Sequence, residues 1–144
     1  MLRHIHPLLG PELLGALRAL GHGDEVVIAD ANFPSHSVGP EVVRLDGIDA
    51  VTAAEAILTH LPLDTFEDAA FRMAVVGDPD AVPEVCRLFQ DSVNRLAGDF
   101  TVHAVERFAF YERAKKAQLI VATGERRLYG NLILKTGVLP EDNR

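Results

Sequence analysis

Apolar positions along the chain follow two spacings, one typical of helices and one typical of strands. In residues 11–20, four leucines recur at helical spacing behind Pro11, a residue favoured in the first turn of a helix. Residues 25–29 (EVVIA) are a short, largely β-branched run between turn formers, which predicts a buried strand. Residues 30–40 are rich in turn formers and have no period, so we expect a long, ordered loop with a functional role.

The rest of the chain continues this alternation. The pattern predicts further strands at residues 42–45, 71–76, 101–105, 119–122 and 132–134, and further helices at residues 52–61, 82–96 and 108–117. Strands that alternate with helices favour an α/β fold, here a three-layer sandwich in which helices cover the faces of a mostly parallel sheet. The sequence has no internal repeat, linker or low-complexity tract, so we expect one domain over residues 1–144.

The composition indicates a soluble domain with a core of its own. With 144 residues, 48% of them hydrophobic, the chain can bury a sizeable apolar core. The formal net charge of -7 argues against nucleic acids and anionic membranes as partners, because these attract clustered lysine and arginine. Cys86 is the only cysteine, which excludes an intramolecular disulfide and fits a reducing compartment. No apolar run approaches the ~20 residues of a membrane span and no signal peptide is evident, so we expect a cytoplasmic protein.

Two polar residues flank the strand predicted at residues 25–29. His22 lies between two glycines, which leave the backbone free to present its imidazole, a group that carries protons in either direction near neutral pH. The plainer interpretation is a histidine at a helix end, favoured by the helix dipole. Asp30 follows the strand, where a carboxylate binds ligand hydroxyls or simply caps a turn. His36 lies in the same loop, and we assign it no role.

Two later segments also combine polar and aromatic residues. Residues 107–116 (RFAFYERAKK) read as a half-buried helix with Phe108 and Tyr111 inward, and Arg107 at its start opposes the helix dipole, which suggests an anionic or ligand-binding partner. Residues 123–131 (TGERRLYGN) follow a strand and carry the hydrogen-bonding groups expected around a small polar ligand, although a plain surface loop also fits. The phosphate-loop and dinucleotide fingerprints are missing, which disfavours a nucleotide-binding module.

Taken together, these motifs resemble a known family. The segments GHGDE, DANFPSHS, RFAFYERA, TGER and YGN occur in this order along nearly the whole chain, and they resemble the fucose branch of the RbsD/FucU family. Residues 64–99 are the least similar part. The resemblance implies an isomerase that interconverts the α and β anomers of L-fucose or a related aldose, without a cofactor or a metal. It further implies a ring-like homo-oligomer, often a decamer, with monosaccharide sites near subunit contacts.

The resemblance also implies roles for individual residues. By position, His22 is the proton donor, and Tyr111 has a catalytic role in animal relatives of the family. The residues that correspond to sugar ligands are Asp30, Arg107, Tyr129 and Asn131. Two alternatives remain open: a D-ribose pyranase that interconverts pyranose and furanose forms, and a non-catalytic monosaccharide-binding or transport-accessory protein.

The predicted positions of His22 and Asp30 raise a geometric difficulty. The strand between them is about five residues long, and at roughly 3.3 Å per residue it separates its ends by about 16 Å. Either the loop that carries His22 folds back along the strand, or a neighbouring subunit completes the pocket. We favour a pocket shared between subunits.

Overall fold

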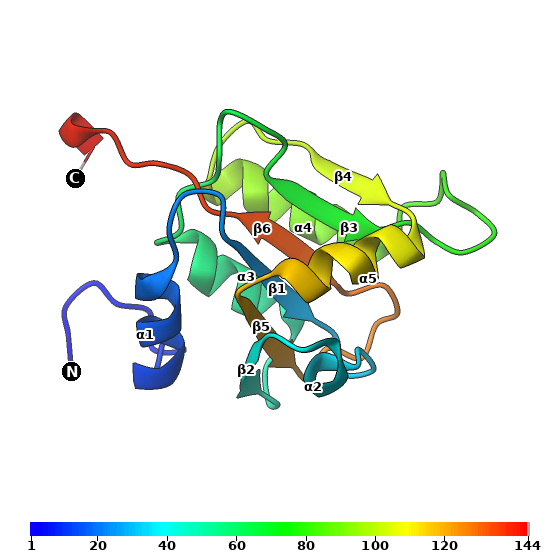
Figure 1. Cartoon of the computed structure of the whole chain (residues 1–144), viewed down its shortest axis with the longest axis horizontal. Coiled ribbons are helices and arrows are strands. Elements are labelled where there is room, and N and C mark those ends of the chain that lie inside the picture. Colours follow the sequence, from blue (N-terminus) through cyan, green and yellow to red (C-terminus); the bar gives the residue numbers. More distant parts are fainter. Residues whose placement is uncertain (144) are drawn as a thin grey trace.

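A computed structural model of the chain describes residues 1–143 and shows one six-stranded sheet with the strand order β2-β5-β1-β6-β3-β4 (Figure 1). The strands are β1 (Glu25–Ala29), β2 (Glu41–Leu45), β3 (Ala70–Met73), β4 (Val102–Val105), β5 (Leu119–Thr123) and β6 (Leu132–Lys135). The pairings of β1 with β5, β2 with β5 and β3 with β4 are parallel, while β6 is antiparallel to β1 and β3. The predicted mostly parallel sheet is therefore confirmed. The reversal of β6 follows from residues 124–131, which contain no helix and thus lack the crossover that a parallel return needs.

Helices cover both faces of this sheet. They are α1 (Pro11–Ala19), α2 (Ser35–Val38), α3 (Ala50–Leu58), α4 (Glu84–Leu96) and α5 (Arg107–Lys116), followed by a 3-10 turn at Glu141–Asn143. The predicted helices are confirmed, with ends shifted by up to three residues. The loop predicted at residues 30–40 is partly wrong, because it contains α2, a single turn too short to show a helical period. Within residues 1–143, no helix is long and apolar enough to cross a membrane.

The side chains of β1 show why three layers form. Val26 and Ile28 point into a core shared with α1, α3 and α4, whereas Val27 and Ala29 point into a second core shared with α2 and α5. All four are fully buried. A continuous apolar run is what a strand covered on both faces requires, so the sequence EVVIA encodes its place in the middle of the sandwich.

The antiparallel pair of β1 and β6 defines two ends of the molecule. Glu25 pairs with Lys135 at one end, and Ile28 pairs with Leu132 at the other. The turn before β1 therefore lies beside the residues after β6, where the Gly23 N–H donates to the Thr136 carbonyl at 2.8 Å. We call this the amino end of β1. The opposite, carboxyl end carries the loop after β1 and the residues before β6 (Figure 1).

Candidate active site

A buried carboxylate and a carboxamide lock together at the carboxyl end of β1. The Asn131 Nδ2 donates to an oxygen of Asp30 at 2.9 Å, and the Asp30 N–H donates to the Asn131 Oδ1 at 2.8 Å. The other carboxylate oxygen accepts the Asn32 N–H at 2.9 Å. Burial raises the pKa of Asp30 above its usual value; hydrogen bonds from Asn32 and Asn131 offset this in part, and the charge of Glu125 adds to it. Asp30 is thus a rigid acceptor that forms no ion pair within residues 1–143.

The turn before Asn131 approaches Asp30 closely. Tyr129 has a left-handed backbone (φ 65°), a conformation that few side chains adopt without support. The next position, Gly130, requires glycine because a Cβ there would lie 2.6 Å from Cγ of Glu125 and 3.5 Å from Cβ of Asp30. The Tyr129 hydroxyl oxygen accepts the Val76 N–H at 3.1 Å, which leaves its O–H hydrogen for another acceptor. The YGN motif therefore places a hydroxyl and an amide at one site.

An ion pair between the buried Glu125 and the half-buried Arg127 holds the preceding loop. Arg127 donates through Nε and Nη2 to the two oxygens of Glu125, each at 2.9 Å, and the Ala50 N–H donates to the same carboxylate at 3.2 Å. The side chain of Arg127 lowers the pKa of Glu125 to about 2, against the opposing effect of burial. The Glu125 carbonyl also accepts the Ala31 N–H at 2.9 Å. Sequence reasoning assigned Glu125 and Arg127 no individual function, because their pairing depends on the loop conformation.

Five of the six candidate residues from the sequence line one cavity at this end. Its volume is about 220 Å³. These five residues are Asp30, Arg107, Tyr111, Tyr129 and Asn131. The Tyr111 ring stacks on Phe33, with centroids 5.4 Å apart and planes inclined by 18°, so the predicted inward position of Tyr111 is confirmed. The predicted inward position of Phe108 is wrong, because its side chain is 63% exposed. Arg107 is exposed at the start of α5, with its guanidinium 4.6 Å from the Phe108 ring centroid.

The sixth candidate, His22, lies at the amino end of β1. Gly23 is left-handed there (φ 87°), as the flanking glycines suggested, and the His22 side chain is 49% exposed. Its Nε2 lies 3.1 Å from Oδ1 of Asp64, a carboxylate that is only 1% exposed. The Phe66 ring covers the imidazole, with centroids 5.4 Å apart.

Asp64 is a functional candidate that sequence reasoning missed. Burial acts to raise its pKa, but the Phe66 N–H, His22 and Lys135 outweigh this effect and lower the pKa below its usual value. An ionised carboxylate at Nε2 favours the imidazole tautomer with hydrogen on Nε2, which leaves Nδ1 as the basic nitrogen. No local pattern marks Asp64, since only the long-range bridge between Leu63 and Thr136 brings it beside His22.

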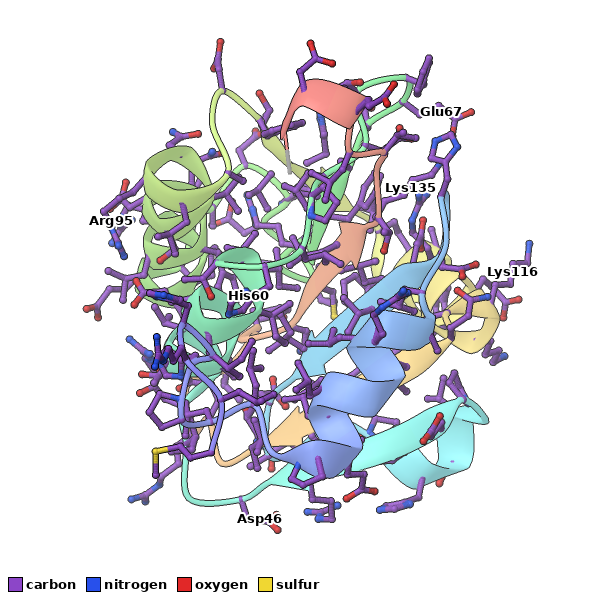
Figure 2. The ribbon with its side chains drawn as sticks, turned by 90° about the vertical axis from the view of Figure 1, so that its left-hand side faces the viewer. Asp46, His60, Glu67, Arg95, Lys116 and Lys135 are labelled. Carbon is purple, nitrogen blue, oxygen red and sulfur yellow. The ribbon has the colours of Figure 1, made fainter. Side chains whose placement is uncertain are left out.

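Lysine and glutamate side chains complete the amino end. Lys135 Nζ lies 3.7 Å from Oδ2 of Asp64 and pairs with Glu67. Hydrogen bonding to Glu67 raises the pKa of Lys135. Figure 2 shows Lys135 and Glu67 toward one end of the molecule and Asp46, which directly follows β2, at the other. The charges around His22 therefore belong to a different end from the Asp30 cavity.

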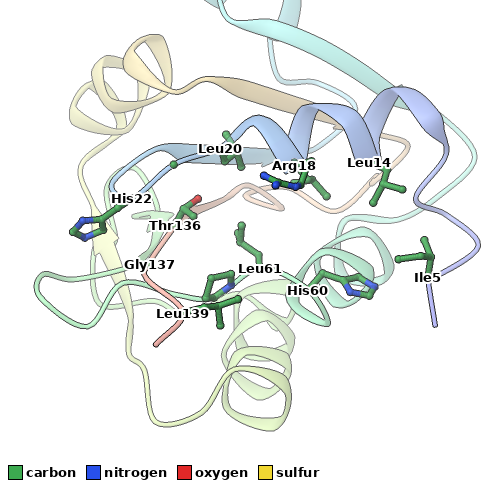
Figure 3. A pocket seen from close by; sticks show the side chains of 13 residues that line it. Ile5, Leu14, Arg18, Leu20, His22, His60, Leu61, Thr136, Gly137 and Leu139 are labelled. Carbon is green, nitrogen blue, oxygen red and sulfur yellow. The ribbon is translucent and has the colours of Figure 1, made fainter. Parts of the chain in front are cut away.

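His22 lines a separate cavity of about 380 Å³. Figure 3 shows His22 at one end of this cavity and His60 and Ile5 at the other, with Leu20 and Leu61 between them. The His22 loop does not fold back along β1, so this first solution to the geometric difficulty is wrong. Within one chain, the structure brings five candidates together and leaves His22 apart.

Comparison with known proteins agrees with the motifs. A family model described as the RbsD / FucU transport protein family matches residues 3–139. The chain belongs to the RbsD/FucU family. The resemblance drawn from the GHGDE, RFAFYERA and YGN segments is therefore confirmed.

Solved structures of the RbsD/FucU fold extend this comparison. Protein Atu2016, to which a sugar-binding role is attributed, is 44% identical, with 97% of each chain covered and a TM-score of 0.92. The fucose mutarotase of Streptococcus pneumoniae, solved with L-fucose, is 40% identical, with 96% of this chain and 100% of that chain covered and a TM-score of 0.89. RbsD of Bacillus subtilis, solved with D-ribose, is 24% identical, with 94% of this chain and 98% of that chain covered and a TM-score of 0.73. That last likeness concerns the fold alone.

Proposed function

We propose that this protein is a sugar mutarotase that interconverts the α and β anomers of L-fucose or a closely related aldose. The observation that carries the proposal is the convergence of Asp30, Tyr129 and Asn131 with two further candidates on one cavity. A solved fucose mutarotase that is 40% identical over nearly the full length supports L-fucose as the first substrate to test.

The geometry fits the chemistry of ring opening. A pyranose changes anomer when one group protonates the ring oxygen and another removes the proton from the anomeric hydroxyl; closure reverses these roles. The site must therefore hold the distal hydroxyls firmly and leave the anomeric carbon free to turn. Asp30 and Asn131, fixed by their mutual hydrogen bonds, provide the firm part. The chemistry itself requires only proton transfer, for which one positioned acid or base contributes roughly 10²- to 10⁴-fold.

His22 is the proposed proton carrier, and Asp64 is its positioning residue. With Nε2 directed at Asp64, the imidazole presents Nδ1 on the partly exposed side of the ring. The same pairing stabilises the imidazolium that forms when His22 accepts a proton. His22 takes the proton of the anomeric hydroxyl during opening, and the Tyr111 hydroxyl, on the Asp30 cavity, is the proposed second group that protonates the ring oxygen; closure reverses both transfers.

A complete site requires a second copy of the chain. The Asp30 cavity, at about 220 Å³, is smaller than the ~300 Å³ at which small-molecule sites begin, and His22 lies at the other end of β1. Large apolar side chains are exposed beside both halves: Phe66, 75% exposed, covers His22, and Leu128, 68% exposed, lines the Asp30 cavity. A contact that joins these two unlike surfaces is head-to-tail, and such contacts form a ring when the rotation between neighbouring copies closes. We therefore propose a homo-oligomeric ring with shared sites.

Anomer-resolved saturation-exchange NMR on the purified protein tests the function. We expect accelerated exchange between the α and β signals of L-fucose, first order in protein concentration. A D-ribose arm separates the pyranase alternative, because a pyranase exchanges pyranose with furanose signals. Exchange at the buffer rate for every aldose tested, with sugar binding retained, would instead favour a non-catalytic binding protein.

A further inference from the structure

Arg72 is a buried charge without a counter-charge. It lies in β3, a strand whose four residues are all buried, and only 7% of its surface is exposed. Its Nη1 is buried without a hydrogen-bond partner among the described residues, its Nη2 reaches the Ala81 carbonyl at 3.5 Å, and it also contacts the Cys86 thiol. A buried cation in this state is unfavourable by several kcal/mol unless something pairs with it.

No carboxylate in the described part of the chain pairs with Arg72. The arginines with a carboxylate oxygen within 4.0 Å are Arg44, Arg95, Arg113 and Arg127. The neighbouring thiol of Cys86 does not supply a charge either, since burial raises its pKa despite the opposing effect of Arg72 and Arg87. The described residues therefore place no counter-charge within ion-pair distance of Arg72, and a ligand can supply one.

A cavity of about 370 Å³ between β3 and α4 offers the place for a ligand. Arg72 and Arg87 line it, together with Cys86, Gln90 and Asp91. Gln90 is already engaged, because it donates to the Phe100 carbonyl and accepts the Val102 N–H, each at 2.8 Å. Arg87 donates one N–H to the Val82 carbonyl at 2.6 Å and has further donors available. The two guanidinium groups are therefore the main polar donors of this cavity.

We propose that this cavity binds a phosphate group, held by Arg72 and Arg87. Guanidinium groups present paired N–H donors that match phosphate oxygens, and a dianion supplies the charge that Arg72 lacks. The cavity shares no lining residue with the Asp30 cavity or with the His22 cavity, so it is a site separate from the proposed sugar site. The phosphate group belongs either to inorganic phosphate or to a small phosphate monoester; Asp91 at the cavity wall would accept a hydroxyl of the latter.

Isothermal titration calorimetry on the full chain tests this site. Inorganic phosphate and glycerol 3-phosphate are titrated separately, with glycerol as the uncharged control, at constant ionic strength in chloride. We expect saturable binding of at least one phosphate compound with a Kd of about 1 mM or tighter, and none of glycerol. Tighter binding of glycerol 3-phosphate identifies a monoester site, whereas equal or weaker binding identifies a site for free phosphate. Absence of saturable binding for both phosphate compounds overturns the proposal.

Matched variants locate the binding. Arg72→Met should weaken phosphate binding at least about tenfold, and Arg44→Met, which removes an exposed arginine paired with Asp46, should leave it unchanged. Equal weakening in both variants would mean that phosphate responds only to net charge. Methionine suits a buried strand position, so Arg72→Met should melt no lower than the parent protein in phosphate-free buffer. Should it fail to fold, the exposed Arg87→Met provides the same test with a several-fold loss expected.

Asp91→Asn separates the proposal from a purely structural ion pair. If Asp91 pairs with Arg72 in solution, its neutralisation lowers the melting temperature and leaves phosphate without effect on stability, which contradicts the proposal. If phosphate is the partner, Asp91→Asn keeps the melting temperature in phosphate-free buffer. In that case phosphate raises the melting temperature of the parent and of Asp91→Asn, but not that of Arg72→Met.

Discussion

The two ends of β1 each hold a buried carboxylate, and the pKa values of these groups are shifted in opposite directions. Burial raises the pKa of Asp30, whose hydrogen-bond donors are the neutral amides of Asn32 and Asn131. At the other end, Phe66, His22 and Lys135 together lower the pKa of Asp64 in spite of its burial. Both positions look alike in the chain, since each is an aspartate next to a strand or bridge. The partners, rather than the position, distinguish the proposed acceptor for sugar hydroxyls, Asp30, from the proposed support for a proton carrier, Asp64.

In the proposed mechanism, this contrast explains why both ends are needed. The Asp30 end carries fixed hydrogen-bonding groups, and the proposed proton carrier lies at the other end of a five-residue strand. In the proposed ring, two copies of the chain bring unlike ends together.

The largest effect is expected from His22→Gln. Glutamine keeps a polar side chain near Asp64 but cannot carry a proton, so catalysed anomer exchange should fall by about 10²- to 10⁴-fold. Saturation-exchange NMR on L-fucose measures the rate, and ligand-observed titration measures binding, which should change little. His36→Gln is the matched control, because the His36 ring contacts Arg44 and lines neither the Asp30 cavity nor the His22 cavity. Full activity of His22→Gln would exclude His22 as the proton carrier.

Mixing two inactive variants tests the shared site directly. His22→Gln damages one end and Asn131→Ala damages the other, so a ring assembled from both contains some sites built from two intact ends. After joint unfolding and refolding at equal amounts, random assembly should make about a quarter of the sites intact. Mixing without refolding controls for subunit exchange. Activity that stays at the level of the separate variants would indicate that each chain builds its own site.

The pH dependence of stability tests the ion pair between Glu125 and Arg127, which supports the loop at the Asp30 end. The pKa of Glu125 is lowered to about 2 in the folded protein, so its ion pair stabilises the fold fully above the unfolded pKa of roughly 4.5 and is lost as pH falls toward 2. Because Arg127 is 37% exposed, we discount the full shift and expect a loss of about 2 kcal/mol in the free energy of unfolding. Urea titrations followed by circular dichroism measure it, since the chain has no tryptophan. Glu125→Gln should lack this part of the pH dependence, whereas the exposed Glu41→Gln should keep it.

The sequence predicts the Asp30 end far better than the His22 end. Asp30, Tyr129 and Asn131 lie directly beside β1 and β6, two strands that the apolar pattern locates to within one residue. The antiparallel pairing of these strands places the end of β1 beside the start of β6, which brings the three residues together. Asp64 has no such anchor. Its place beside His22 depends on the bridge between Leu63 and Thr136, a contact between segments far apart in the chain that no local period encodes.

The remaining difference between sequence and structure concerns charge pairs. A sequence motif identifies the residues of a site. It does not identify the partner of each charged group, because that depends on side-chain directions that only the packed fold defines. Arg127 appeared in a polar loop and turned out to hold Glu125. The reversal of β6 is similar, because the sequence located the strand but its direction follows from the missing crossover helix.

The smallest and most specific effect is expected from Asp64→Asn. The amide keeps the shape and one hydrogen bond to His22 but removes the charge that favours the Nε2–H tautomer and the imidazolium. We expect about a tenfold loss in the rate of exchange, with substrate binding unchanged, because Asp64 acts through His22. In the double variant with His22→Gln, Asp64→Asn should add almost nothing, since residues that act as a unit are not additive. A further tenfold loss in the double variant would show that Asp64 contributes independently of His22, and the two ends would then differ by more than the partner of one histidine.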